Sequence, residues 1–547
     1  MPPTAFSALR RGLRRAEDGI GTSRGALAVV AAAVVVYGLE SIALPVIPGR
    51  DFGTYLRSYA QLWDWHSVWP MTMLFRTPLA PLVVGLPLDV AGGWAAQVVM
   101  GLLFALSVLA WSRTALAFGG RAALLATVAL LLYPGYSILF HELASDAVAA
   151  VAFSGWALAL SRAWHRPSAR RFALVGLAVA ATALSRPANQ VLVVAALAPL
   201  VLAIPWPRRI ACAFACAGTA VLVLGVWAVN NGLRYQDYAV SRAGDAYLPF
   251  FRAFTQDHIV APENGPASRK LARAVQRQLL TQEPYRSYRV DLRTFFARGS
   301  DREFEDVVGL SDRVWGWDTD YAVVRKAGIE AVRAHPRSYA AGVANTFLRE
   351  LWHPLFVALP GAGDAGVEGG RASVDSVVVG GRRLPSPGSE AIPAAHQSFA
   401  SSTPDGHITE VWTSPTEHTV VFRDSRDQRR YASINAEVGR LTAQVPPYAG
   451  NEWLTRQLSR SSKLFPPPLL WLVAGLVGLA VRRPLRSGLA LTLAFGPVLV
   501  TLVNAMTIYP VIEFAVPVAP ALVVLGAAGL LGARSGSARL HRSRKDP

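Results

Sequence analysis

Long apolar runs alternate with short polar stretches along most of the chain. The first run covers about residues 25–47 and is followed by a more polar loop at 48–92. A helix of about 20 apolar residues crosses the hydrocarbon core of a bilayer, which is about 30 Å thick. Further runs of this kind lie at about 93–112, 121–139, 143–161, 170–187, 188–205, 209–229, 464–481, 486–505 and 510–532. The pattern predicts an α-helical polytopic membrane protein with about ten transmembrane helices.

The orientation of these helices depends on the apolar segment Thr77–Leu88. Pro78, Pro81 and Pro87 make this segment a poor spanning helix. If it crossed the membrane, the arginine clusters of the later loops would face outward. If it is interfacial or re-entrant, the clusters lie inside, as the positive-inside rule requires. These clusters are at 162–171, 208–209 and 482–486. We therefore predict interfacial helices within the first outer loop, 48–92.

One long polar region separates the two groups of predicted helices. Residues 230–463 then lie on the outer side, between the transmembrane modules 25–229 and 464–532. Their periodicities predict an extracytoplasmic α+β region, with helices over 230–358, a Gly/Ser/Pro-rich linker at 360–395 and a β-containing part at 396–463. The elements expected there are helices at Arg269–Leu280, Asp320–Ala334 and Ser338–Trp352, and strands at Ile408–Thr413 and Thr419–Arg423. The basic segments 1–24 and 533–547 are predicted to be cytoplasmic.

Composition and charge agree with a membrane location. The chain of 547 residues is 52% hydrophobic and only 16% charged, whereas a soluble protein carries about a quarter charged residues. The net charge of +18 comes from arginines that flank the apolar runs, so it favours membrane orientation over nucleic-acid binding. The partners expected from composition are membrane lipids, with no nucleic acid. The only cysteines, Cys212 and Cys216, lie in one apolar run, so the polar region does not rely on disulfides.

An amphipathic segment with an acidic residue at its head follows the first apolar run. Asp51 lies at the start of this segment, and aromatic and apolar residues then recur at helical spacing. They are Tyr55, Tyr59, Leu62 and Trp63. The pattern predicts a helix in the membrane interface, with its aromatic face toward the lipid. Asp51 is the candidate catalytic residue, a general base that accepts a proton from an acceptor hydroxyl. Its alternative role is that of a helix N-cap.

A second acidic stretch, His141-Glu142-Leu-Ala-Ser-Asp146, precedes the predicted span at 143–161. Glu142 and Asp146 are four residues apart, so they share one helix face near its N-terminus. Binding of the acceptor, or of a divalent metal together with His141, is the functional hypothesis for these three residues. Stabilisation by the positive end of the helix dipole is the alternative for the two carboxylates. The sequence does not require a cofactor, and the metal stays an open alternative.

Arg186 lies deep in apolar sequence close to the predicted outer face. A guanidinium suits a phosphate diester because it is planar, permanently charged and able to bind in bidentate fashion. Arg186 is therefore the candidate for binding the phosphate of a donor, and Arg57 and Arg76 are secondary candidates. The alternative for Arg186 is an internal ion pair with Glu142 or Asp146.

The order and spacing of these segments resemble the GT-C superfamily of membrane glycosyltransferases. The resemblance is to the branch that contains protein O-mannosyltransferases and lipid A aminoarabinose transferases. The segments that carry it are Asp51–Trp65, Thr77–Leu82, Pro134–Asp146, Asn230–Tyr235, His335–Tyr339 and, more loosely, Pro510–Pro520.

The resemblance implies transfer of a sugar from a polyprenyl-phosphate donor to a hydroxyl of a glycan, lipid or protein on the outer face. In-line attack by the acceptor would invert the anomeric centre, and the sugar would be a hexose or a pentose. The expected location is a bacterial plasma membrane, in a multi-pass protein that serves the cell envelope and has its active site on the extracytoplasmic face. A transporter or flippase of lipid-linked sugars is one alternative, although such proteins often have two related halves, which are not evident here. A non-catalytic membrane-anchored binding protein is the other.

Overall fold

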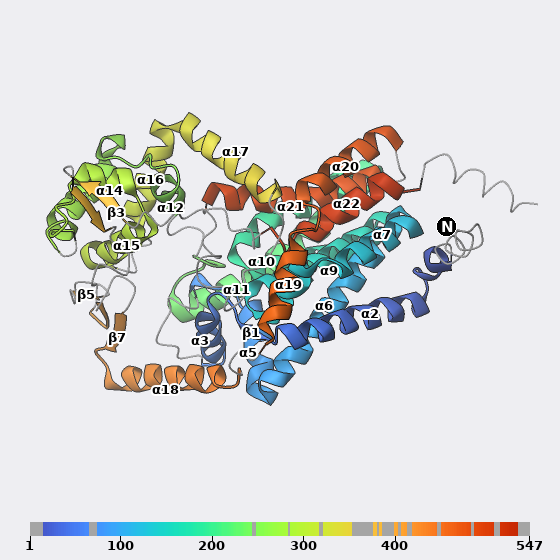
Figure 1. The fold of residues 1–547 in the computed structure, drawn as a ribbon, viewed down its shortest axis with the longest axis horizontal. Helices are drawn as coiled ribbons and strands as arrows, with labels where there is room; N and C mark the ends of the chain where they lie inside the picture. The colour runs from blue at the N-terminus through green and yellow to red at the C-terminus, as the bar shows by residue number, and fades with distance from the viewer. Residues whose placement is uncertain are drawn as a thin grey trace, which may run out of the picture.

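Helices dominate the computed structural model, and they form one long apolar bundle with a polar unit attached (Figure 1). The structure describes residues 15–64, 74–242, 248–282, 285–316, 321–352, 376–379, 382–385, 399–402, 406–412, 418–445, 450–482, 486–507 and 515–533. Glu513, in the late segment of the family resemblance, lies outside these ranges.

Among the described residues, five helices are long and apolar enough to cross a membrane. They are α2 (Ser23–Ala43), α6 (Gly93–Ala115) with its short extension to Phe118, α9 (Ser145–His165), α11 (Trp206–Tyr235) and α21 (Ser487–Thr507). A sixth span results if α7 (Gly120–Leu131) and the segment Pro134–His141 count as one helix bent by 62°. The prediction of about ten spans is therefore confirmed only as a multi-helix apolar bundle.

The other apolar runs form shorter helices. They are α5 (Leu79–Ala91), α10 (Ala169–Ser185), η3 (Pro187–Val201), α20 (Pro468–Arg482) and α22 (Ala519–Leu531). Pro187 ends α10 because proline cannot continue the helix, and the chain then turns back as η3. At about 2.0 Å per residue, the 3₁₀-type helix η3 extends about 30 Å, farther than an α-helix of equal length. The length of an apolar run alone could not reveal these breaks.

Small residues bring the helices of the bundle into close contact. A Cβ on Gly176 of α10 would lie 2.1 Å from the Cys216 carbonyl oxygen of α11, and a Cβ on Gly478 of α20 would lie 2.3 Å from the backbone of Gly529 in α22. Such approach is typical of helix packing in membranes, where van der Waals contact takes the place of the hydrophobic effect.

The polar region forms a helical unit with its own core. Its helices are α12 (Phe250–Thr255), α13 (Pro266–Ala274) with the π-turn Val275–Leu279, α14 (Leu292–Arg298), α15 (Asp301–Trp315) and α16 (Ala322–Ala334). Phenylalanines supply large side chains to this core, among them Phe250, Phe254, Phe295 and Phe296. Helix α17 (Pro336–Trp352) runs from this unit back to the bundle (Figure 1), where the Tyr339 hydroxyl donates to the Met506 carbonyl at 2.5 Å.

The stretch predicted as β-containing is mixed. Strands β5 (Phe399–Ser402), β6 (Ile408–Trp412) and β7 (His418–Phe422) form an antiparallel sheet in that order, and β3 (Ser376–Val379) pairs with β4 (Arg382–Pro385) inside the predicted linker. Two helices that the prediction missed follow, α18 (Ser425–Thr442) and α19 (Glu452–Ser462). Asp424 begins α18 as its N-cap by accepting from the Arg426 N–H.

The two ends of the bundle differ in charge. Helix α9 carries Asp146 at its start and Arg162 near its end, so a rise of about 1.5 Å per residue separates them by roughly 24 Å. The Arg486 side chain donates to the Ala117 carbonyl beside the Arg162 end at 2.7 Å. Near the C-terminus of α11, Arg234 donates to the Leu62 carbonyl in the outer loop at 3.1 Å. Arg208 and Arg209 at the N-terminus of α11 therefore lie at the other end of the bundle. The described arginines of all three clusters therefore occupy the end opposite Asp51.

We expect Gly478→Ala to lower the unfolding midpoint of the purified protein. The added Cβ would meet the Gly529 backbone, which cannot move aside as a side chain can, and overpacking of this kind costs about 1–3 kcal/mol. Gly218→Ala in α11 is the matched control, because its Cβ meets nothing within 4 Å. Equal midpoints for the two variants would contradict the packing of α20 on α22.

Candidate functional site

Two segments far apart in the sequence meet at the end of the bundle that carries Asp51. Strand β1 (Ile47–Pro48) pairs in parallel with β2 (Glu142–Leu143), with Ile47 opposite Glu142. Gly49 makes the approach possible, because a Cβ there would lie 2.8 Å from the Cβ of Ala144. This short pairing brings the first outer loop against the start of α9.

Asp51 occupies the N-cap position of α3 (Phe52–Leu62), but its side chain caps nothing. Its φ of 61° is left-handed, a conformation that Asp tolerates better than most residues. The carboxylate instead accepts from Arg76 Nη2 at 2.9 Å, and 39% of the Asp51 side chain stays exposed. Asp51 is therefore available to a molecule that approaches from outside.

The aromatic face of α3 packs against protein, which corrects the prediction that it faces lipid. Tyr55 and Tyr59 are buried, and only Trp63 is largely exposed. The Tyr59 ring fills the space above Gly85 of α5, and its hydroxyl donates to Asp89 at 2.8 Å. The helical spacing was predicted correctly, but helix α5 covers the face that periodicity assigned to the membrane.

Tyr55 connects two ion pairs. The guanidinium of Arg76 lies over its ring, 5.3 Å from the centroid, and Ser145 and Asp146 of α9 both affect the pKa of its hydroxyl. Burial raises the pKa of Tyr55, and Arg76 partly opposes that shift, so the hydroxyl is protonated at neutral pH. The charges of Asp51 and Asp146 both act on this hydroxyl.

The second pair joins Asp146 in the first turn of α9 to Arg186 at the break between α10 and η3. Both side chains are only 13–14% exposed. The ion pair that the sequence offered as the alternative role for Arg186 is therefore present. The same contact brings Arg186 to the group around Tyr55, so a structural and a binding role are compatible.

His141 faces the interior and lies apart from the two ion pairs. It is fully buried, stacks on Tyr37 with ring centroids 4.2 Å apart, and has Nε2 3.8 Å from a Glu40 carboxylate oxygen. Glu40 also accepts from the Ser137 hydroxyl at 2.8 Å. Glu142 is half-buried in β2. Within the described ranges, no three His, Cys, Asp or Glu residues are placed to hold a metal ion together, so the geometry gives the metal hypothesis no support.

Arg57 points away from Asp51, toward α18. Its guanidinium donates to Asn435 at 3.1 Å and lies 5.8 Å from the centroid of the Tyr431 ring. The structure therefore brings together Asp51, Arg76, Asp146 and Arg186 of the predicted site residues, and it separates Arg57 and His141 from them.

Tyr55 and Ser145 are the members of this group that sequence reasoning missed. Tyr55 was noted only for its place in the aromatic pattern, and Ser145 lies directly before Asp146. The available signal was the offset of four residues between Asp51 and Tyr55, which puts both on one side of the first turn of α3.

No protein-family model and no curated protein matches the chain. It is similar to two solved structures of ArnT from Cupriavidus metallidurans, a GT-C aminoarabinose transferase. The structure bound to undecaprenyl phosphate is 15% identical with a TM-score of 0.32, over 92% of this chain and 78% of that chain. The apo structure is 16% identical with a TM-score of 0.32, over 91% and 77%.

We expect Asp146→Ala and Arg186→Ala each to destabilise the protein by about 3 kcal/mol, because each leaves an unpaired charge in a largely buried site. The double variant should lose less stability than the sum of the two single losses. A double-mutant cycle of unfolding free energies should therefore give a coupling above about 1 kcal/mol.

The exposed pair Glu452 and Arg456, with charged atoms 4.0 Å apart, is the control for this cycle. Its coupling should stay below about 0.5 kcal/mol. Additive losses at Asp146 and Arg186 would contradict the buried pair.

Proposed function

We propose that this protein is a membrane glycosyltransferase that moves a hexose or pentose from a polyprenyl-phosphate donor to a hydroxyl acceptor on the extracytoplasmic face. The observation that carries the proposal is the convergence of two carboxylate–guanidinium pairs around Tyr55, at one end of a bundle of apolar helices. Charged groups at such a depth are unfavourable unless they are paired, and they are commonly functional.

Sugar transfer from a phosphate carrier needs a base for the acceptor and a cation for the leaving group. Asp51 is the proposed base because its carboxylate is the more exposed of the two. Arg76 holds that carboxylate in place at 2.9 Å. Arg186 is the proposed cation for the phosphate, since a guanidinium can neutralise the charge that develops there.

The proposed reaction is an inverting displacement, with Asp51 acting on the acceptor and Arg186 on the leaving phosphate. Base and leaving phosphate must lie on opposite sides of the anomeric carbon. The Arg76 guanidinium of the first pair lies over the ring of Tyr55, and the Asp146 carboxylate of the second pair acts on the Tyr55 hydroxyl. Arg57, held by Asn435, has no part in this proposal.

Asp51→Asn should lower sugar transfer at least about 100-fold, since general-base catalysis contributes about 100- to 10,000-fold. The measurement is transfer of label from polyprenyl-phosphate sugars in membranes that contain the full chain. Glu452→Gln, an exposed acidic residue of the polar region, should leave the rate unchanged.

Undiminished transfer by Asp51→Asn would exclude Asp51 as the base. Movement of labelled lipid between leaflets without consumption of donor would favour a transporter instead.

The orientation is supported by the position of the arginine clusters at the end of the bundle opposite Asp51. We expect a cysteine introduced at Glu452 to react with a membrane-impermeant maleimide in intact cells, and one at Arg170 to react only after permeabilisation. The natural Cys212 and Cys216 are buried and serve as the background control. The reverse labelling pattern would contradict an extracytoplasmic site.

A further inference from the structure

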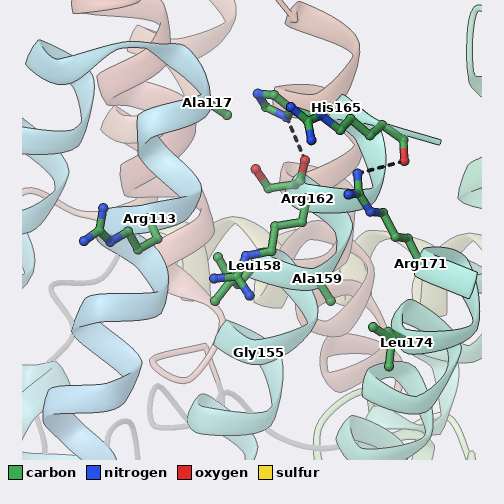
Figure 2. A pocket seen from close by; sticks show the side chains of 11 residues that line it. Arg113, Ala117, Gly155, Leu158, Ala159, Arg162, His165, Arg171 and Leu174 are labelled. Carbon is green, nitrogen blue, oxygen red and sulfur yellow. Dashed lines mark hydrogen bonds between the residues drawn. The ribbon is translucent and has the colours of Figure 1, made fainter. Parts of the chain in front are cut away.

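A basic cavity lies at the end of the bundle opposite Asp51 (Figure 2). It measures about 530 Å³ and is formed by the end of α6, the end of α9 and the start of α10. Figure 2 shows Arg113 on one side, Arg162 in the middle and Arg171 on the other side. Arg166 completes the basic part of the lining. No role assigned above uses this cavity.

The lining combines a charged part with an apolar part. Besides the four arginines and His165, it includes Ala117, Leu158, Ala159 and Leu174. No carboxylate is among the described residues that line it, so the positive charges are not balanced from within. Guanidinium groups that face one cavity repel one another, and an anion between them removes that repulsion.

Backbone carbonyls fix two of the arginines, and two are available to a ligand. Arg113 donates to the carbonyls of Gly21 and Thr22 at 2.6 and 2.7 Å, and Arg171 donates to that of Arg166 at 3.1 Å. These contacts orient the guanidinium groups without neutralising them. Arg162 and Arg166 have no side-chain partner in the part of the chain that the structure describes.

We propose that this cavity binds the phosphate headgroup of an anionic phospholipid. The guanidinium groups fit phosphate, which they can bind in bidentate fashion. The apolar part of the lining fits the start of an acyl chain, and the exposed Leu174 and Leu177 continue this apolar surface along α10. Basic pockets between transmembrane helices bind anionic headgroups in this way.

This inference does not depend on the proposed transfer reaction. Arg162 in this cavity lies roughly 24 Å from Asp146 along α9, so a lipid headgroup bound there does not compete with the sugar donor. With the orientation proposed above, the lipid belongs to the cytoplasmic leaflet. It would hold α6, α9 and α10 together at their basic ends.

The test is native mass spectrometry of the purified full chain in detergent, titrated with phosphatidylglycerol or with phosphatidylcholine. We expect one phosphatidylglycerol to bind about 30-fold more tightly than phosphatidylcholine. Arg162→Gln/Arg166→Gln should lose that preference. Arg170→Gln/Arg208→Gln removes the same charge from exposed arginines at the same end of the bundle but outside the cavity lining, and it should keep the preference.

A second variant tests the apolar part without a change of charge. Leu158→Trp should fill the cavity and weaken phosphatidylglycerol binding while the gel-filtration profile stays that of the wild type. Equal loss in the Arg170/Arg208 control, or equal binding of both lipids by the wild type, would overturn the proposal. Displacement of the lipid by millimolar inorganic phosphate would overturn it too, because free phosphate would then be the ligand.

Discussion

The pairing of buried charges at one end of the bundle is the constraint around which this molecule is organised. Asp146 and Arg186 come from helices α9 and α10, and both are almost removed from solvent. A charge in that position is costly without its partner, so the contact fixes how the start of α9 meets the break after α10. The parallel pairing of Ile47 with Glu142 then sets the first outer loop against the same place. The stability of this end of the bundle and the arrangement of the candidate site therefore arise from the same contacts.

At the opposite end of the bundle, the arginines are not paired with carboxylates in the same way. Arg113 and Arg171 donate to neutral carbonyls, and Arg162 and Arg166 face a cavity without a carboxylate in its described lining. Their charge is left to the surroundings, which at a membrane surface contain anionic headgroups. At one end of the bundle, charges are paired within the protein. At the other end, we infer that an anionic lipid neutralises them.

Much of the candidate site could be predicted because its charged residues interrupt otherwise apolar sequence. Asp51, Asp146 and Arg186 stand out as charges at the ends of apolar runs, and charges there are rare unless paired or functional. Arg57 satisfied the same criterion but points to Asn435, because α18, a helix that the sequence pattern did not predict, lies along α3. His141 lies apart from the group because Glu40 and Tyr37 from the first span enclose it.

The sequence by itself determined that this is a multi-helix membrane protein with a polar region of helices and strands. It could do so because apolar length, arginine position and helical periodicity are local properties of the chain. Tertiary structure decided which face of α3 is buried, where the apolar runs break, and that Tyr55 links two ion pairs from distant segments. Periodicity shows that a helix has an apolar face, but it cannot distinguish lipid from another helix as the partner of that face. Only the packing of α5 against α3, with Gly85 beneath Tyr59, settles that choice.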